Sequence, residues 1–221
     1  MTSDGRLLLA DVIDNDSWRL WPSGDKRLQK DKQAYRDLKE VTDQAMDQIR
    51  DNYAWVAEKS GQLLKAPPSK VVILMGSESD RVHSMKIAAI LQQLHIDYQV
   101  RVCSAHKSTE ELLKMLATIE GSGVPTVLIA VAGRSNGLGP VMAGNTSLPV
   151  VNCPPLVHHD EIWSSLTLPS GLGCCTSINT DGAALMAGHI LAMTNHIIWG
   201  CVRGNRLKRW LQIKKADVNN I

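Results

Sequence analysis

Residues 71–75 (VVILM) form an unbroken apolar run that ends abruptly at Gly76. A strand with apolar residues on both faces is typical of a parallel sheet, because helices cover both sides of such a sheet. Residues 125–132 (PTVLIAVA) repeat the pattern. The sequence therefore predicts a chain organised around a sheet that is buried on both faces.

Further strands are predicted at residues 98–102, 148–153 and 171–178, and helical patterns alternate with them. The helix that opens at Asp80 has apolar residues at a spacing of three or four positions. These residues are Val82, Met85, Ala89, Leu91 and Leu94.

Two later helices have predicted starting points. Ser108 with Glu111 three residues on fits a capping box for a helix through Glu120. Thr180 or Asp181 is expected to begin a long C-terminal helix. Strands and helices in this alternation predict the α/β class, with a three-layer, flavodoxin-like parallel sheet and a long C-terminal helix.

Polar loops follow three of the predicted strands: residues 76–80 (GSESD), 104–107 (SAHK) and 133–140 (GRSNGLGP). Because neighbouring parallel strands end at one edge of a sheet, we expect these loops to converge on one crevice. The first loop leads into a helix, so its backbone N–H groups and the helix dipole suit a phosphate. The alternative is that each loop is an ordinary connection.

His106 is the candidate for proton transfer, because an imidazole changes its charge near neutral pH. The alternative is a structural histidine. Lys107 can neutralise an anion, and a cation at a helix N-terminus is unfavourable unless an anion binds there. The loop at 133–140 lets backbone approach a small or flat ligand, but it matches neither the Rossmann nor the P-loop pattern. NAD and ATP are therefore poor candidates for this part of the chain.

Two consecutive prolines at 67–68 predict a boundary between a first domain, residues 1–66, and a second, residues 67–221. Charged residues are denser before this boundary than after it. The first domain is expected to be a short α+β unit, too small to enclose a nucleotide site alone.

Within the first domain, residues 6–13 are predicted to form a strand, and a helix is predicted at 43–64 after Thr42. Aspartates cluster at the end of the strand and directly after it. They fit either Mg²⁺ ligands on a nucleotide or a polar turn, and they are Asp11, Asp14 and Asp16.

Composition argues for a small-molecule ligand. The net charge of +2 comes without a basic block, so no nucleic-acid partner is expected. Five cysteines without a C-x-x-C pair indicate reduced thiols rather than a disulfide framework or a zinc site, and Cys174 and Cys175 are interpreted as packing residues. Residues 158–161 (HHDE) are interpreted as a polar loop, so no metal site is predicted.

No secretory signal is visible at the N-terminus, and residues 183–202 include His189, Thr194, Asn195 and His196. Polar groups in lipid are costly, so we expect this apolar segment to be a buried helix rather than a membrane span. A soluble, cytoplasmic protein is expected.

In its three loops the chain resembles the phosphoribosylaminoimidazole carboxylase family of de novo purine synthesis. The stretches that carry the resemblance are residues 76–80, 104–107 and 132–140. Lys107 after the histidine and the Arg-Ser-Asn-Gly loop are similar to the animal type, which uses CO₂ directly. That type forms the C-terminal half of a bifunctional carboxylase and succinocarboxamide synthase. Residues 1–65 resemble the end of the synthase domain.

The resemblance implies carboxylation of 5-aminoimidazole ribonucleotide by CO₂ to 4-carboxy-5-aminoimidazole ribonucleotide, without ATP, biotin or metal. It implies that His106 moves the proton, with Lys107 beside it, and that the family's octameric assembly extends to this chain, as a homo-octamer or mixed with full-length enzyme. ATP and Mg²⁺ are implied only for a complete synthase domain. The implied ligand-binding residues are Gly76, Ser77, Asp80, Ser104, Lys107, Arg134, Ser135, Asn136 and Gly137.

The chain departs from the family pattern at Ser108-Thr109, where Gly-Pro is common, and in a shorter stretch at 156–163. It also lacks the ATP-binding portion of the synthase, so synthase activity is not expected. Two alternatives remain open. One is a non-catalytic scaffold that assembles with the full-length enzyme, and the other is a flavodoxin-like module for another phosphorylated ligand.

Overall fold

The computed structural model describes residues 19–156 and 158–218. The chain divides into two compact units, Met1–Lys65 with Leu211–Ile221, and Ala66–Trp210. The domain assignment 1–66 and 67–221 stays a prediction.

The larger unit contains a five-stranded sheet in the order β2-β1-β3-β4-β5, with every neighbouring pair parallel. The chain moves outward from β1 to β2 and then returns to the other side of β1 for β3, so the order reverses between β1 and β3. This is the predicted flavodoxin-like fold. The strands are β1 (Lys70–Met75), β2 (Asp97–Val102), β3 (Thr126–Val131), β4 (Val150–Asn152) and β5 (Cys175–Thr176).

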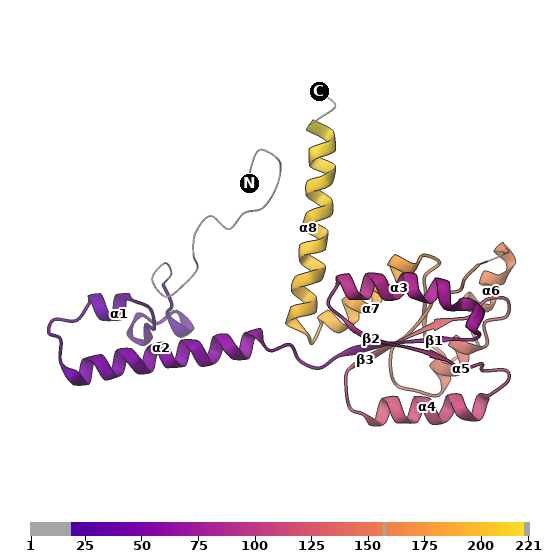
Figure 1. Cartoon of the computed structure of the whole chain (residues 1–221), viewed down its shortest axis with the longest axis horizontal. Helices are drawn as coiled ribbons and strands as arrows, with labels where there is room; N and C mark the ends of the chain where they lie inside the picture. Colours follow the sequence, from indigo (N-terminus) through magenta and orange to yellow (C-terminus); the bar gives the residue numbers. More distant parts are fainter. Residues whose placement is uncertain (1–18, 157, 219–221) are drawn as a thin grey trace. The chain divides into compact units, whose positions relative to one another are not determined.

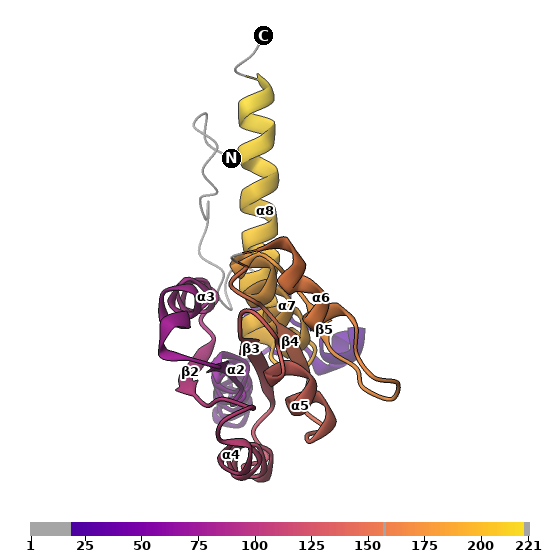
Figure 2. The same cartoon turned by 90° about the vertical axis from the view of Figure 1, so that its right-hand side faces the viewer.

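Helices cover both faces of this sheet, with α3 and α7 on one face and α4 and α5 on the other (Figures 1 and 2). Short 3₁₀ turns, η3 (Glu78–Asp80) and η4 (His159–Ile162), precede α3 and α6. The helices are α3 (Arg81–Gln93), α4 (Thr109–Gly121), α5 (Leu138–Gly144), α6 (Trp163–Leu166), α7 (Thr180–Ala192) and α8 (His196–Val218).

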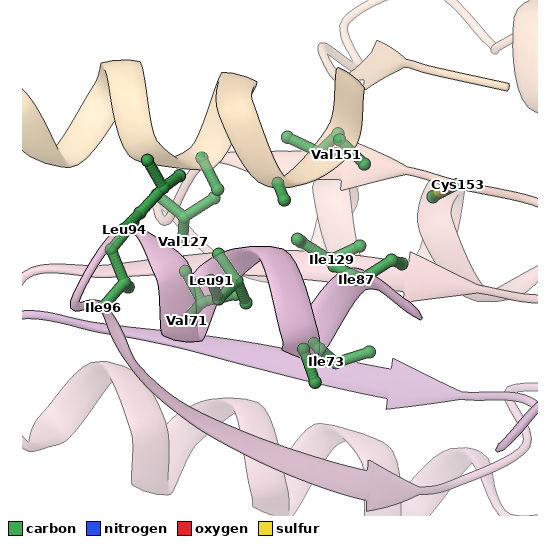
Figure 3. Close-up of a cluster of buried hydrophobic side chains, with 14 of the residues drawn as sticks. Val71, Ile73, Ile87, Leu91, Leu94, Ile96, Val127, Ile129, Val151 and Cys153 are labelled. Atoms are coloured by element: carbon green, nitrogen blue, oxygen red, sulfur yellow. The ribbon is translucent and has the colours of Figure 1, made fainter. Parts of the chain in front are cut away.

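Alternate residues of β1 enter two separate cores, because successive side chains of a strand point to opposite faces. Val71 and Ile73 belong to the cluster under α3 and α7, which Figure 3 shows, and Val72 and Leu74 belong to the cluster against α4 and α5. All four side chains are fully buried. This double burial explains the unbroken apolar run.

The buried face of α3 differs from the apolar stripe expected for it. Leu91 and Leu94 of that stripe are buried as expected, but Val82 (73% exposed), Met85 and Ala89 are exposed, and Ile87 is buried instead. The small residues Ser84 and Ala88 complete the buried face, and small residues let α3 approach the sheet and α7 closely. Both stripes have helical spacing, so periodicity alone does not choose between them.

The predicted long C-terminal helix is present as α8, but its predicted start at Thr180 or Asp181 is wrong, because Thr180 begins a separate helix, α7, that ends at Ala192, and α8 begins at His196. Asn195 lies at the break between the two helices. Its Oδ1 accepts hydrogen bonds from the backbone N–H groups of Ile197 (3.0 Å) and Ile198 (3.2 Å), which caps the new helix. No helix in the described part of the chain combines the length and apolar character needed to cross a membrane.

The described part of the smaller unit before Lys65 is helical: η1 (Pro22–Gly24), η2 (Lys26–Leu28), α1 (Gln33–Arg36) and α2 (Asp43–Leu64). The predicted start of α2 is confirmed, since Thr42 Oγ1 accepts from Ala45 N at 3.2 Å. The strand predicted at 6–13 and the aspartates Asp11, Asp14 and Asp16 lie outside the described residues.

Candidate active site

A cleft of about 480 Å³ opens at the carboxyl edge of the sheet, where the strand order reverses. The loops after β1, β2 and β3 line it together, and its volume falls within the range of small-molecule sites. The lining residues are Gly76, Ser77, Ser79, Asp80, Ser104, Ala105, His106, Lys107, Ala132, Gly133, Arg134, Ser135 and Leu138.

The loop after β1 contributes hydroxyl groups and one carboxyl group. Ser77 Oγ accepts from Ser79 N (3.3 Å) and lies 3.0 Å from Ser79 Oγ, which fixes the turn into η3. Burial raises the pKa of Asp80 above its ordinary value, against the smaller lowering effects of nearby hydrogen bonds and His83. The corner therefore presents donors for an anion beside a carboxyl group that is costly to ionise.

His106 lies in a turn that two hydroxyl groups stabilise. Ser108 Oγ donates to the carbonyl of Ser104 at 3.0 Å, and Thr109 Oγ1 donates to the carbonyl of Ala105. The predicted capping box is wrong, because the Ser108 hydroxyl bonds backward and caps no N–H of α4. Ser108-Thr109, the departure from the family pattern, thus supplies its own hydrogen bonds to the turn.

Two cationic side chains line the cleft, Lys107 and Arg134. Among residues 19–156 and 158–218, neither has a carboxylate partner. Both are exposed, as is His106. An exposed pair of unneutralised cations in a cleft suits an anionic ligand such as a phosphate or carboxylate.

Arg134 adopts a left-handed backbone conformation with φ of 56°, which is uncommon outside glycine. Ser164 of α6 holds this strained point, because its Oγ lies 3.2 Å from the carbonyl of Arg134 and accepts from the backbone N–H of Asn136 at 2.9 Å. Strained backbone persists where neighbouring structure fixes it, and it occurs often at functional sites.

Asn136 and Gly137 do not line the cleft, although the family resemblance implies both as ligand-binding residues. Asn136 is 2% exposed, and its side-chain amide is hydrogen-bonded to Asn152, Ser165 and the backbone N–H of Gly139. Gly137 lies beneath His106, where a Cβ atom would come within 2.5 Å of the imidazole Nε2. The remaining candidates line the cleft together.

The sequence analysis did not identify the buried residues that support the loop at 133–140. Asn152 is fully buried in β4, between Val151 and Cys153, and it contacts Asn136. Ser164 and Ser165 of α6 contact the same loop. A polar residue inside an apolar strand was the available signal for Asn152, whereas nothing local in the sequence singles out the two serines.

Cys153, directly after β4, has a buried thiol that does not favour the nucleophilic thiolate form. Burial raises the pKa of Cys153 to about 12, with a smaller contribution from Asp181. His83 Nε2 lies 3.4 Å from its Sγ, and burial lowers the pKa of His83. Both groups are therefore neutral at neutral pH, and the pair serves packing.

The remaining polar motifs do not add to the site. No group of three or more metal-ligating side chains occurs in the described part of the chain, residues 158–161 included. Cys174 is half-buried and packs against the core, whereas Cys175 is exposed, so the packing prediction for Cys175 is wrong. A two-residue β5 leaves that side chain uncovered.

Comparison with known proteins agrees with the geometry. The sequence model of the family described as AIR carboxylase matches residues 70–210, and that of SAICAR synthetase matches residues 1–52. The chain is similar to "Multifunctional protein ADE2" of Gallus gallus, with 54% identity over 96% of this chain and 50% of that protein. The bifunctional phosphoribosylaminoimidazole carboxylase/succinocarboxamide synthetase of Homo sapiens is 52% identical over 96% of this chain and 51% of that protein.

The chain spans about half the length of these relatives. Among solved structures it is similar to Treponema denticola PurE, with a TM-score of 0.67 and 34% identity over 68% of this chain and 98% of that chain. The family match covers the sheet and all three loops of the cleft. This chain belongs to the AIR carboxylase family.

Proposed function

We propose that this chain catalyses the carboxylation of 5-aminoimidazole ribonucleotide by CO₂, giving 4-carboxy-5-aminoimidazole ribonucleotide for the synthesis of IMP. The observation that carries the proposal is the position of His106 beside two cationic side chains in one cleft of an AIR carboxylase family member. The names of the relatives from Homo sapiens and Rattus norvegicus include phosphoribosylaminoimidazole carboxylase.

In the proposed reaction, ring carbon C4 of the substrate, made electron-rich by the adjacent amino group, attacks CO₂ and forms a carbon–carbon bond. The hydrogen on C4 must then leave as a proton, and the electron pair of its bond restores the aromatic ring. We assign this proton to the imidazole of His106, which lines the cleft. One proton is released for each carboxylate formed.

The rest of the cleft binds and orients the two substrates. We assign the ribose phosphate to Ser77, Asp80, Ser104 and Lys107, where hydroxyl groups and an unpaired ammonium group meet. Arg134 and Ser135 then face the imidazole ring and CO₂, and backbone N–H groups of their loop stabilise the new carboxylate. Because no cofactor is proposed, the fixed geometry of the two reactants is the main source of the rate acceleration.

We further propose a cytoplasmic homo-octamer, alone or mixed with full-length enzyme. The five cysteines are all free thiols, which fits a reducing compartment. Large apolar side chains stand exposed on α3, α7 and α8, which fits burial between subunits. Residues 1–52 match the SAICAR synthetase model, but residues 1–18, which include Asp11, Asp14 and Asp16, lie outside the described residues, so no synthase reaction is proposed.

The test is ultraviolet turnover of the purified full chain with 5-aminoimidazole ribonucleotide and bicarbonate, without ATP. We expect product from the wild type and none from His106→Asn. His95→Asn is the matched control, because His95 is exposed and has φ of 55°, a conformation that asparagine tolerates.

A folded wild type without turnover would contradict the carboxylase. Tight binding of the aminoimidazole ribonucleotide in that case would favour the non-catalytic scaffold. Equal binding of unrelated ribonucleotides would favour a module for another phosphorylated ligand.

A further inference from the structure

The ring of His106 rests on the backbone of the third loop. A Cβ atom on Gly137 would lie 2.5 Å from His106 Nε2, 2.7 Å from Cε1 and 3.3 Å from Cδ2. Since van der Waals contact begins near 3.4 Å, these distances leave no space for a side chain between Gly137 and the imidazole. The position of the Gly137 backbone therefore limits where the ring lies.

Asn136 fixes the backbone on both sides of Gly137. Its side-chain Oδ1 accepts from Gly139 N at 3.1 Å, beyond Gly137. Its own backbone N–H donates to Ser164 Oγ at 2.9 Å, before Gly137. A shift of the Asn136 side chain thus moves the backbone that supports His106.

Asn152 anchors the side chain of Asn136 to the sheet. Its Oδ1 accepts from Asn136 Nδ2 at 3.2 Å, and Ser165 Oγ accepts from the same nitrogen at 2.9 Å. The Nδ2 of Asn152 donates to Cys174 Sγ at 3.0 Å. A Cβ on Gly139 would overlap Asn152 Oδ1, so the loop is packed directly on this amide.

Burying the side-chain amide of Asn152 costs free energy unless the amide is hydrogen-bonded, and the hydrogen bonds described above meet this requirement. An apolar residue at position 152 would continue the strand without that requirement. Asn152 does not line the cleft, so its contribution to a ligand is indirect.

We propose that Asn152, with Ser165 of α6, is a positioning residue that holds the imidazole of His106 in place through Asn136 and the backbone at Gly137. The inference rests on the proposed carboxylation. It assigns a role in that reaction to the residues that support the loop at 133–140. The phosphate-binding loops at 76–80 and 104–107 are held by their own hydrogen bonds. Substitution of Asn152 or Ser165 is therefore expected to lower kcat more than it weakens nucleotide binding.

The test uses Asn152→Leu, which keeps the branching and the number of heavy atoms of the side chain but removes its hydrogen bonds, and the milder Ser165→Ala. The matched control is Ser69→Ala, because Ser69 Oγ also accepts from a buried asparagine, Asn195 Nδ2, at 2.9 Å. Ser69 directly precedes β1 and Asn195 directly precedes α8, and neither residue lines the cleft. All three variants are made in the full chain.

We expect kcat to fall about 10- to 100-fold in Asn152→Leu, by a smaller factor in Ser165→Ala, and not at all in Ser69→Ala, with nucleotide Kd unchanged. The double variant Asn152→Leu/Ser165→Ala should be no worse than Asn152→Leu, because both act on one amide. If Asn152→Leu does not fold, Ser165→Ala alone decides.

A second readout is independent of turnover. Histidine labelled with ¹³C at Cε1 gives a resonance for His106, identified by its loss in His106→Asn. We expect it to shift in Asn152→Leu and Ser165→Ala but not in Ser69→Ala. An unmoved resonance overturns the positioning role even if the wild type proves to be no carboxylase. If the wild type is active, an unchanged kcat in Asn152→Leu and Ser165→Ala also overturns it. A fall in kcat that Ser69→Ala shares also overturns it.

Discussion

Gly137 lies against the imidazole of His106 so closely that position 137 has no room for a side chain. The two residues come from different loops, after β3 and after β2, and meet only in the folded chain. The glycine is needed here for close approach rather than for a positive φ, since its φ is −76°.

Gly137→Ala is therefore predicted to displace the ring of His106. We expect kcat for carboxylation to fall about 100-fold, because a displacement near 1 Å suffices for such a loss. Nucleotide Kd measured by calorimetry should change little. The control is Gly121→Ala at the end of α4, where a Cβ meets nothing within 4 Å. Full activity in Gly137→Ala would show that the ring has freedom to move.

The predictability of the site follows from which contacts are local. The strands, the loops after them and His106 could be read from the sequence, because an apolar run followed by glycine and polar residues is a local pattern. The order β2-β1-β3-β4-β5 then brings the loops to one edge. The resemblance to a known family supplied the reaction.

The residues that orient the loop could not be predicted in this way. Asn136 is a polar loop residue in the sequence, and only its contacts with Asn152 and Ser165 show that it is structural. These partners are 16 and 29 positions away. Likewise, Asn195 was counted as a polar interruption, and its capping of α8 was not foreseen. Long-range hydrogen bonds leave no periodic signal.

The two faces of α3 predict opposite responses to truncation. Leu91→Ala removes a fully buried side chain, and we expect the free energy of unfolding to fall by about 2–5 kcal/mol. Val82→Ala alters a side chain that is 73% exposed, and we expect a change within about 0.5 kcal/mol. Urea denaturation of both variants checks this. A larger loss for Val82→Ala than for Leu91→Ala would contradict the observed orientation of α3.

Asn195 connects the start of α8 to the segment before β1. Its Nδ2 donates to the carbonyl of Pro67 (2.9 Å) and to Ser69 Oγ (2.9 Å), while its Oδ1 caps the helix. We expect Asn195→Ala to lower the free energy of unfolding by about 1–3 kcal/mol, since it removes the cap and leaves buried groups unpaired.

Asn195→Asp keeps an oxygen that can cap α8 but loses both N–H donors of the amide. If the cap contributes most of the stabilisation, Asn195→Asp should lower the free energy of unfolding less than Asn195→Ala does. Thermal unfolding followed by circular dichroism compares the two. Equal stability of the wild type and Asn195→Ala would mean that the break between α7 and α8 does not depend on this side chain.

Asp80 gives the prediction for pH dependence. Burial raises its pKa in the folded chain above the ordinary value of 3.8. Below that ordinary value the carboxyl group is protonated in both states and has no effect on stability. As the pH rises through the folded pKa, the buried group must ionise, and stability is lost. Asp80→Asn cannot ionise, so its stability relative to the wild type should increase from acid to neutral pH.

The same substitution should weaken nucleotide binding, because Asp80 lines the cleft and its carboxylate is an acceptor for ribose hydroxyl groups. A gain in stability joined to a loss of binding is the trade-off expected of a functional residue. Urea denaturation from acid to neutral pH, with calorimetric binding at neutral pH, measures both effects. Asp97→Asn, which changes an exposed carboxyl group outside the cleft, is the control. A stability difference between Asp80→Asn and wild type that stays constant across this range would show that ionisation of Asp80 does not oppose folding.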